Sequence, residues 1–356
     1  MANDPGMGMT REEGIQTVFD GPRHVVILGA GASIAAARYN PEPSGKKLPS
    51  MDDLIDVVGL GDIIDATGSG RQTKNFEEAY SRLHANSPDS PALAKIEQRV
   101  ADYFRSLTLP STPTIYDYLL LALRPRDLIA TFNWDPFLYQ AWLRNRHVAG
   151  MPYLSFLHGS VSIGYSPEDH KAGPAGGSSK ATGHEYVPTR LLFPVTQKDY
   201  NRDEFSTREW ARLKLWLGQA KRITIFGYSA PHTDVEAMKI MTGAWGDPGH
   251  RNMEQVELID VQPEDVLTQR WTRFIYPGHS DYCTSYFESV LAFFPRRTGE
   301  SYMHQFVFST VAEALQAPNP IPEHFDTLEA MWEWHRPLIE AENKHDAGHP
   351  DDKKRE

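Results

Sequence analysis

Arg23-His-Val-Val-Ile-Leu28 runs directly into Gly29-Ala-Gly-Ala-Ser33, and this stretch decides the fold. The first six residues form a short aliphatic run that is typical of a strand buried on both faces. Gly29 ends that run, and the small residues after it suit a tight turn that opens a helix. We therefore predict a strand, a turn and a helix at this point of the chain.

The same alternation continues downstream. Apolar runs of strand length occupy 127–131, 153–157, 222–226 and 255–259, and segments with helical periodicity separate most of them. Strands that alternate with helices specify a parallel sheet covered on both faces. The predicted fold class is α/β, a Rossmann-like doubly wound parallel sheet with its ligand site at the carboxyl ends of the strands.

Composition divides the rest of the chain. Apolar residues recur at helical spacing over 75–123, whereas 160–190 is rich in Gly, Ser, Pro and Lys. The expected parts are a flexible N-terminus (1–22), a ligand-binding domain (23–294) with a helical insertion (75–123) and a mobile loop (160–190), a small helical appendage (295–339) and a disordered charged tail (340–356).

Charge and cysteine content exclude several classes of function. The 356 residues carry 36 basic and 47 acidic side chains, a net charge of −11, which gives no footprint for direct nucleic-acid binding. Cys283 is the only cysteine, so neither an intrachain disulfide nor a site with several thiolate ligands can form. No segment has the apolar length of a signal peptide or a membrane span. We expect a cytoplasmic protein that does not bind membranes.

Polar residues follow the predicted strands at their carboxyl ends. Asn133 and Asp135 come directly after 127–131, and His158 with Gly159 follows 153–157. An amide can orient a ribose hydroxyl or a water, and an imidazole can transfer a proton near neutral pH. The structural alternatives are an Asx turn in which Asp135 caps the next helix, and a histidine that serves packing only.

The glycines at 29 and 31 have two interpretations. They can let a pyrophosphate approach the backbone and the helix N-terminus, or they can satisfy steric demands of the turn. Ile34 stands where a complete dinucleotide fingerprint has glycine. Asp53 is explained by a capping box with Ser50, so it is no sign of a dehydrogenase.

Taken in order, the motifs resemble the sirtuin superfamily. They are Gly29-Ala-Gly-Ala-Ser33, Thr131-Phe-Asn-Trp-Asp135, His158-Gly159 and Phe226-Gly-Tyr-Ser229, and the resemblance covers roughly residues 23–290. It implies an NAD+ site whose cofactor contacts are Gly29, Ala30, Gly31, Ser33, Thr131, Phe132, Gly227, Ser229 and Asp260. It further implies that His158 is the catalytic histidine and that Asn133 and Asp135 face the nicotinamide ribose.

The departures from the family are equally informative. Sirtuins that deacylate lysine hold a structural zinc on four cysteines after the His-Gly, and this chain has one cysteine in all. The combination resembles bacterial sirtuin-like NAD+ hydrolases of anti-phage defence, without zinc. That resemblance implies cleavage of NAD+ to nicotinamide and ADP-ribose, a homo-oligomer, and a partner such as an ATPase or an Argonaute-type protein.

Two other functions stay open on the sequence. One is an NAD-dependent deacylase or ADP-ribosyltransferase, with the segment 160–190 as the platform for a second substrate. The other is a nucleotide-binding sensor or assembly subunit without turnover. Helical residues around Leu328 to Trp334 are a candidate interface, with ordinary packing as the alternative.

Overall fold

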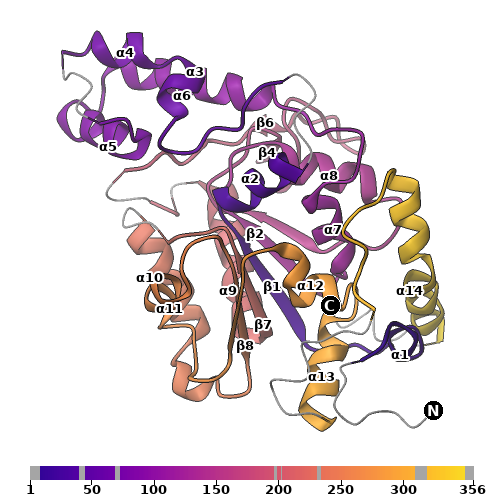
Figure 1. Ribbon diagram of the computed structural model, residues 1–356. Helices are drawn as coiled ribbons and strands as arrows, with labels where there is room; N and C mark the ends of the chain where they lie inside the picture. The colour runs from indigo at the N-terminus through magenta and orange to yellow at the C-terminus, as the bar shows by residue number, and fades with distance from the viewer. Residues whose placement is uncertain are drawn as a thin grey trace.

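A six-stranded parallel sheet forms the centre of the computed structural model (Figure 1), which describes residues 9–39, 45–68, 73–195, 199–201, 203–230, 234–308 and 319–348. The strands are β1 (Arg23–Leu28), β2 (Leu128–Thr131), β3 (Tyr153–Phe156), β7 (Ala220–Phe226), β8 (Gln255–Ile259) and β9 (Ser280–Cys283). Their order is β3-β2-β1-β7-β8-β9, and every adjacent pair is parallel. The fold class predicted from the sequence is confirmed.

This strand order fixes where a ligand can sit. The chain winds outward from β1 through β2 to β3, then crosses back to β7 and winds outward in the other direction. Connections leave β1 and β7 on opposite faces, which opens a crevice at their carboxyl ends. The β1 and β7 junction is therefore the topological switch point of the sheet.

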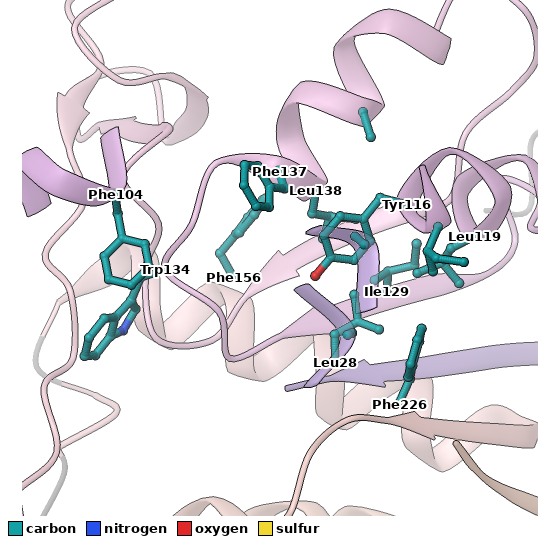
Figure 2. Close-up of a cluster of buried hydrophobic side chains, with 14 of the residues drawn as sticks. Leu28, Phe104, Tyr116, Leu119, Ile129, Trp134, Phe137, Leu138, Phe156 and Phe226 are labelled. Atoms are coloured by element: carbon teal, nitrogen blue, oxygen red, sulfur yellow. The ribbon is translucent and has the colours of Figure 1, made fainter. Parts of the chain in front are cut away.

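Pleating divides the interior into two hydrophobic cores. Val26 and Leu28 of β1 lie in one core, and Val25 and Ile27 lie in the other. Helices α9 (Glu204–Gln219), α10 (Val235–Trp245) and α11 (Glu264–Trp271) cover the second core on one side of the sheet in Figure 1. The first core is covered by α2 (Ala30–Tyr39), α7 (Ile115–Ala122), α8 (Phe137–Asn145) and α12 (Val290–Phe293). Figure 2 shows part of that first core.

Strand β9 was not predicted. Its sequence, Ser280-Asp-Tyr-Cys283, lacks the aliphatic run of the other strands, and only Cys283 is buried. As an edge strand, β9 pairs with β8 alone and has less need of apolar side chains on both faces. Backbone pairing rather than burial specifies it.

The helical insertion stands apart from the sheet in Figure 1. It consists of α3 (Leu54–Val58), α4 (Gly61–Asp65), α5 (Phe76–Asn86) and α6 (Pro91–Arg105), so it begins before the predicted 75–123 and ends before α7. Helix α7 is buried at every position and packs on α8 in the main domain. The continuous helical periodicity concealed this division, because insertion and core helices share one period.

The loop expected over 160–190 is instead a small antiparallel sheet. Its strands are β4 (Ile163–Ser166), β5 (Lys171–Pro174) and β6 (Val187–Pro188), in the order β5-β4-β6. Glycine serves close packing here: a Cβ on Gly164 would lie 2.3 Å from the Tyr186 carbonyl oxygen, and one on Gly173 would lie 2.4 Å from the Tyr186 ring. These two glycines serve packing, whereas Gly176 and Gly183 have positive φ, at +72° and +81°, with nothing within 4 Å of an added Cβ.

The chain ends are also more structured than expected. Helix α1 (Arg11–Gln16) begins with a capping box between Thr10 and Glu13, inside the predicted flexible N-terminus. Helix α13 (Thr298–Phe308) and helix α14 (Leu328–Gly348) form the C-terminal appendage, and α14 continues through 340–348, where disorder was predicted. Residues 1–8 and 349–356 lie outside the described residues.

Buried charges explain why α14 extends so far. The Glu342 carboxylate accepts hydrogen bonds from Arg296 and Arg297, and all three side chains are buried. Burial by itself would raise the pKa of Glu342, but Arg296, Arg297 and Arg124 outweigh it and hold that pKa at about 2. The charged segment that begins at residue 340 is therefore held to the rest of the chain by buried ion pairs of Glu342.

Replacing Glu342 by glutamine leaves buried guanidinium groups without their carboxylate. We expect Glu342→Gln to lower the free energy of unfolding at pH 7 by about 3 kcal/mol. Because the pKa of Glu342 is lower in the folded chain, the wild type should lose this stabilisation as pH falls from the unfolded value of 4.5 toward 2. Urea unfolding at several pH values measures both effects. Glu333→Gln on the exposed side of the same helix is the control, and equal losses in both variants would contradict the anchor.

Among the described residues, no helix combines the length and the apolarity needed to cross a lipid bilayer.

Candidate functional site

Two glycine turns pack on each other at the switch point. The N–H of Gly29 donates to the Phe226 carbonyl at 3.0 Å, and the N–H of Gly31 donates to the Gly227 carbonyl at 2.9 Å. A Cβ on Gly31 would lie 2.7 Å from the Gly227 Cα, and Gly227 itself has a φ of +61°. The steric interpretation of these glycines therefore applies, and two of the turn's N–H groups are already used within the protein.

Substitution at this contact tests its structural role. Gly31→Ala places a methyl group against backbone that cannot move aside, and we expect a loss of about 2–3 kcal/mol in unfolding free energy. Gly243→Ala is the matched control: it lies in α10 with nothing within 4 Å of the added Cβ, so it should be neutral or slightly stabilising. Thermal unfolding of both variants gives the comparison. An unchanged melting temperature in Gly31→Ala would contradict the tight contact.

Ser33, Asn133 and Asp135 come together in one hydrogen-bond network beside this turn. The Ser33 hydroxyl donates to Asp135 Oδ2 at 2.6 Å and lies 2.5 Å from the Tyr116 hydroxyl. Asn133 Nδ2 donates to the Gly29 carbonyl at 2.8 Å and to Ser33 Oγ at 2.9 Å. Three of the residues singled out in the sequence, from β1–α2 and from the end of β2, thus form a single cluster.

The Gly29 carbonyl fixes the orientation of the Asn133 amide. A carbonyl only accepts hydrogen bonds, so the amide nitrogen of Asn133 must face it and the amide oxygen must face away. The half-buried Asn133 therefore uses its donor group to hold the glycine turn. Its oxygen is oriented to accept a bond from a hydroxyl or a water on the other side.

Asp135 supports the network from inside the protein. Its carboxylate is buried, Oδ2 accepts from Ser33, and Oδ1 accepts from the Phe137 N–H at 3.1 Å at the start of α8. Burial raises the pKa of Asp135, and the bonds from Ser33 and Phe137 partly oppose this. Both oxygens are engaged within the chain, as the Asx-turn alternative anticipated, so the carboxylate orients Ser33 rather than facing outward.

Tyr116 is a member of this network that the sequence did not indicate. It lies in α7, where Ile115-Tyr-Asp-Tyr-Leu119 has the pattern of ordinary core, and it is fully buried. Its hydroxyl contacts Ser33 Oγ and accepts from Asn133 Nδ2 at 3.3 Å (Figure 2 shows the ring beside Leu28 and Ile129). The signal that could have found it is a phenol in a helix without an exposed face, because a buried hydroxyl needs a polar partner.

Removing the Tyr116 hydroxyl should loosen the network without opening a cavity. We expect Tyr116→Phe to cost about 1 kcal/mol of unfolding free energy, since Ser33 and Asn133 keep other partners. Chemical denaturation measures this cost. Tyr103→Phe, which loses a hydrogen bond to the Lys47 carbonyl in an exposed setting, is the control and should change stability less.

Thr131 and Phe132 face different sides of the sheet edge. Thr131 Oγ1 accepts from the Asn133 N–H at 3.0 Å and so shapes the turn that presents the amide. Phe132 faces the other side, stacked on Tyr228 with ring centroids 4.1 Å apart. It also meets the edge of His158 at 4.8 Å.

His158 belongs to this second, aromatic cluster. The buried imidazole lies parallel to the Tyr200 ring, with Nε2 3.3 Å from the Tyr200 hydroxyl. Nε2 is also 4.0 Å from Asp234 Oδ1, and Asp234 in turn accepts a 2.8 Å bond from Tyr228. A carboxylate beside an imidazole stabilises the protonated ring. The structure thus places His158 in an aromatic cluster with Phe132 and Tyr228, next to the network that holds Asn133.

The remaining residues that were predicted to contact NAD+ lie along the same edge of the sheet, at the carboxyl ends of its strands. Gly227 and Ser229 follow β7, and the Ser229 carbonyl accepts from Arg270 at 3.1 Å. Asp260 follows β8, and its carboxylate accepts from the Gln262 N–H at 3.0 Å. Ala30 is exposed at the first position of α2, whereas Ser229 and Asp260 are half-buried. These residues continue the edge outward from the switch point.

An aromatic group links the helical insertion to this edge. Trp134, between Asn133 and Asp135, packs against Phe193 at 4.8 Å and against Phe104 of α6 at 6.1 Å. Tyr80 of α5 stacks on Phe193 at 5.0 Å. The insertion therefore rests on the side chain that separates two candidate residues, a contact that the sequence did not reveal (Figure 2 shows Phe104 and Trp134).

No group of three His, Cys, Asp or Glu side chains in the described ranges is arranged to hold a metal ion. The zinc module of lysine-deacylating sirtuins needs four cysteines, and Cys283 is the only one in the sequence.

Fold and site together define the class: a doubly wound, Rossmann-like α/β protein whose polar residues gather at the switch point. No protein-family model and no curated protein sequence matches the chain.

Solved structures of Sir2 proteins are similar to it in chain path. A structure of Sir2 enzymes described for their mechanism and regulation is 14% identical, covering 80% of this chain and 94% of that chain, with a TM-score of 0.38. A Sir2 homolog–NAD complex is 14% identical over 87% of this chain and 97% of its own, with a TM-score of 0.37. Sir2 bound to an acetylated peptide is 12% identical over 84% and 98%, with a TM-score of 0.35. At these values the fold assignment rests on the strand order of the sheet itself.

Proposed function

We propose that this chain binds NAD+ at the switch point and hydrolyses the bond between nicotinamide and ribose. The observation that supports this best is the network in which Tyr116, Ser33 and the Gly29 carbonyl orient Asn133 with its amide oxygen outward. A fixed acceptor at the carboxyl ends of β1 and β2 suits a ribose hydroxyl or an attacking water. The order of the motifs resembles that of sirtuins, and this resemblance is the reason for proposing NAD+ as the substrate.

The proposed chemistry needs little from the protein. The nicotinamide ring of NAD+ carries a positive charge, so it leaves with the bonding electrons as a neutral molecule. Water then forms the new bond to the ribose carbon, and ADP-ribose is the second product. The enzyme has to stabilise an oxocarbenium-like ribose and to position the water.

Each candidate side chain has a role in this proposal. Asn133 orients the water or the ribose through its amide oxygen. His158 accepts the proton of the water, directly or through a ribose hydroxyl, and Asp234 at 4.0 Å stabilises the imidazolium that forms. Asp135 and Tyr116 act as positioning residues, because their polar atoms bind Ser33 and Asn133.

The segment after His158-Gly159 favours hydrolysis over transfer to lysine. In place of a four-cysteine zinc module, the chain has the β5-β4-β6 sheet, whose two outer strands are largely exposed. Gly159 has a φ of +73°, and a Cβ there would lie 2.4 Å from the Arg190 carbonyl oxygen, so this sheet is joined tightly to the strand that delivers His158. Water is then the simplest acceptor for the ribosyl group.

Nicotinamide release from NAD+ by the purified chain tests the proposal. We expect turnover in the wild type and a loss of about 100-fold or more in both Asn133→Ala and His158→Ala. His170→Ala and Asn201→Ala, at exposed positions, are the matched controls and should keep full activity. Full activity in both Asn133→Ala and His158→Ala would refute the mechanism.

The same assay separates the other two functions. Consumption of NAD+ only after an acylated peptide or an acceptor protein is added would indicate a deacylase or an ADP-ribosyltransferase. Stoichiometric binding of NAD+ without turnover, with activators present, would indicate a sensor or assembly subunit.

We further propose that the chain acts as a cytoplasmic anti-phage effector, as a homo-oligomer, with an ATPase or Argonaute-type partner as trigger. An enzyme that depletes NAD+ must be held inactive until infection. Cells that express the wild type should lose NAD+ after phage challenge, and cells that express Asn133→Ala should not. Equal NAD+ levels in both would contradict this role.

A further inference from the structure

A cavity lies along the outer edge of the sheet, beside β3 and away from the switch point. Its volume is about 640 Å³, within the range of small-molecule sites. Its lining follows the outer strand β3 from Gly150 to Phe156 and continues to Ala172 of β5, whereas the proposed NAD+ site is at the carboxyl ends of β1 and β7. The cavity therefore lies at the outer edge of the sheet, whereas the switch point between β1 and β7 lies in its middle.

Aromatic side chains from three elements form the walls. Tyr139 and Trp142 of α8 lie parallel, with an interplanar angle of 8° and ring centroids 5.9 Å apart. Phe156 of β3 and Phe205 of α9 are buried at the base, and Tyr153 stands 46% exposed at the rim. Such surfaces favour a planar aromatic ligand, because stacking and edge contacts add to the burial of apolar area.

Side chains of α9 occupy part of the outer edge of β3. The outward N–H of Phe156 donates to Glu209 at 2.8 Å, and the outward carbonyl of Leu154 accepts from Arg212 at 3.1 Å. Glu209 and Arg212 also pair with each other at 2.6 Å. Because side chains of α9 already satisfy these backbone groups, strand addition would have to break them. These bonds favour a small molecule over an extended peptide as the occupant.

One positive charge in the cavity is not neutralised. Glu209 offsets Arg212, whereas the exposed Arg146 has no carboxylate in ion-pair distance within the described part of the chain. Its guanidinium lies 5.5 Å from the Trp142 ring centroid, at the rim. It also lowers the pKa of the Tyr139 hydroxyl against the larger opposite effect of burial. An anionic group on the ligand would complement this charge.

We propose that this cavity binds a small planar aromatic molecule with one anionic group. The aromatic ring would lie between Trp142 and Phe156, and the anionic group would lie at Arg146.

Two related fluorescent probes test the ligand class. Anilinonaphthalenesulfonate has the aromatic rings and an anion, and N-phenylnaphthylamine has the same rings without the anion. We expect saturable binding of both by the native chain. Arg146→Gln should weaken the sulfonate about fivefold and leave the neutral probe unchanged. Arg105→Gln, an exposed arginine on α6, is the matched control and should change neither.

Two further variants address the aromatic walls and the location. Trp142→Leu should weaken both probes about tenfold or more. Ala172→Leu, on the exposed strand β5 that lines the cavity, fills the space without touching the core and should also displace both probes, even if Trp142→Leu folds poorly. Asn133→Ala should bind both probes normally, whatever its effect on NAD+. Unchanged binding in Ala172→Leu, or equal losses in Arg146→Gln and Arg105→Gln, would overturn the proposal.

Discussion

The contact between the Gly29–Gly31 turn and Gly227 determines the arrangement of the whole molecule. It joins β1 to β7 at the point where the sheet reverses its winding, and the Cα of one turn touches the backbone of the other. Only glycine allows that approach, because a Cβ on either side would overlap backbone atoms. Once the two turns are in contact, helix α2 and the residues after β7 are fixed on either side of one crevice.

Asn133 connects this contact to the candidate active site. Its amide nitrogen holds the Gly29 carbonyl and Ser33, and Ser33 is held in turn by Tyr116 and Asp135. Ser33, Asp135 and Tyr116 are buried and hydrogen-bonded within the chain, and such a support is rigid, as a preorganised site requires. The aromatic cluster of His158 lies on the other side of Phe132, so a ligand that uses both clusters must lie across the strand ends.

Buried charge holds the outer parts of the chain to the sheet. Glu342 joins α14 to Arg296 and Arg297, and Glu300 of α13 pairs with Arg124 and Arg126 next to β2. Arg124 and Glu300 are 176 residues apart in the sequence, yet their side chains are in direct contact. The C-terminal appendage therefore stabilises the domain, although its sequence is polar and charged.

The central sheet could be predicted from the sequence alone, because aliphatic strands such as 23–28 must be buried on both faces and the alternation with helices requires parallel winding. The sequence also indicated Ser33, Asn133, Asp135 and His158, since polar residues after such strands lie at one edge. Three features emerged only in three dimensions: Tyr116 and Asp234 join these residues, 160–190 forms a small sheet, and Glu342 is buried. They depend on contacts between residues that are distant in sequence. The local sequence around a tyrosine, a glycine or a glutamate is the same whether that residue contacts protein or solvent, so it does not reveal the partner.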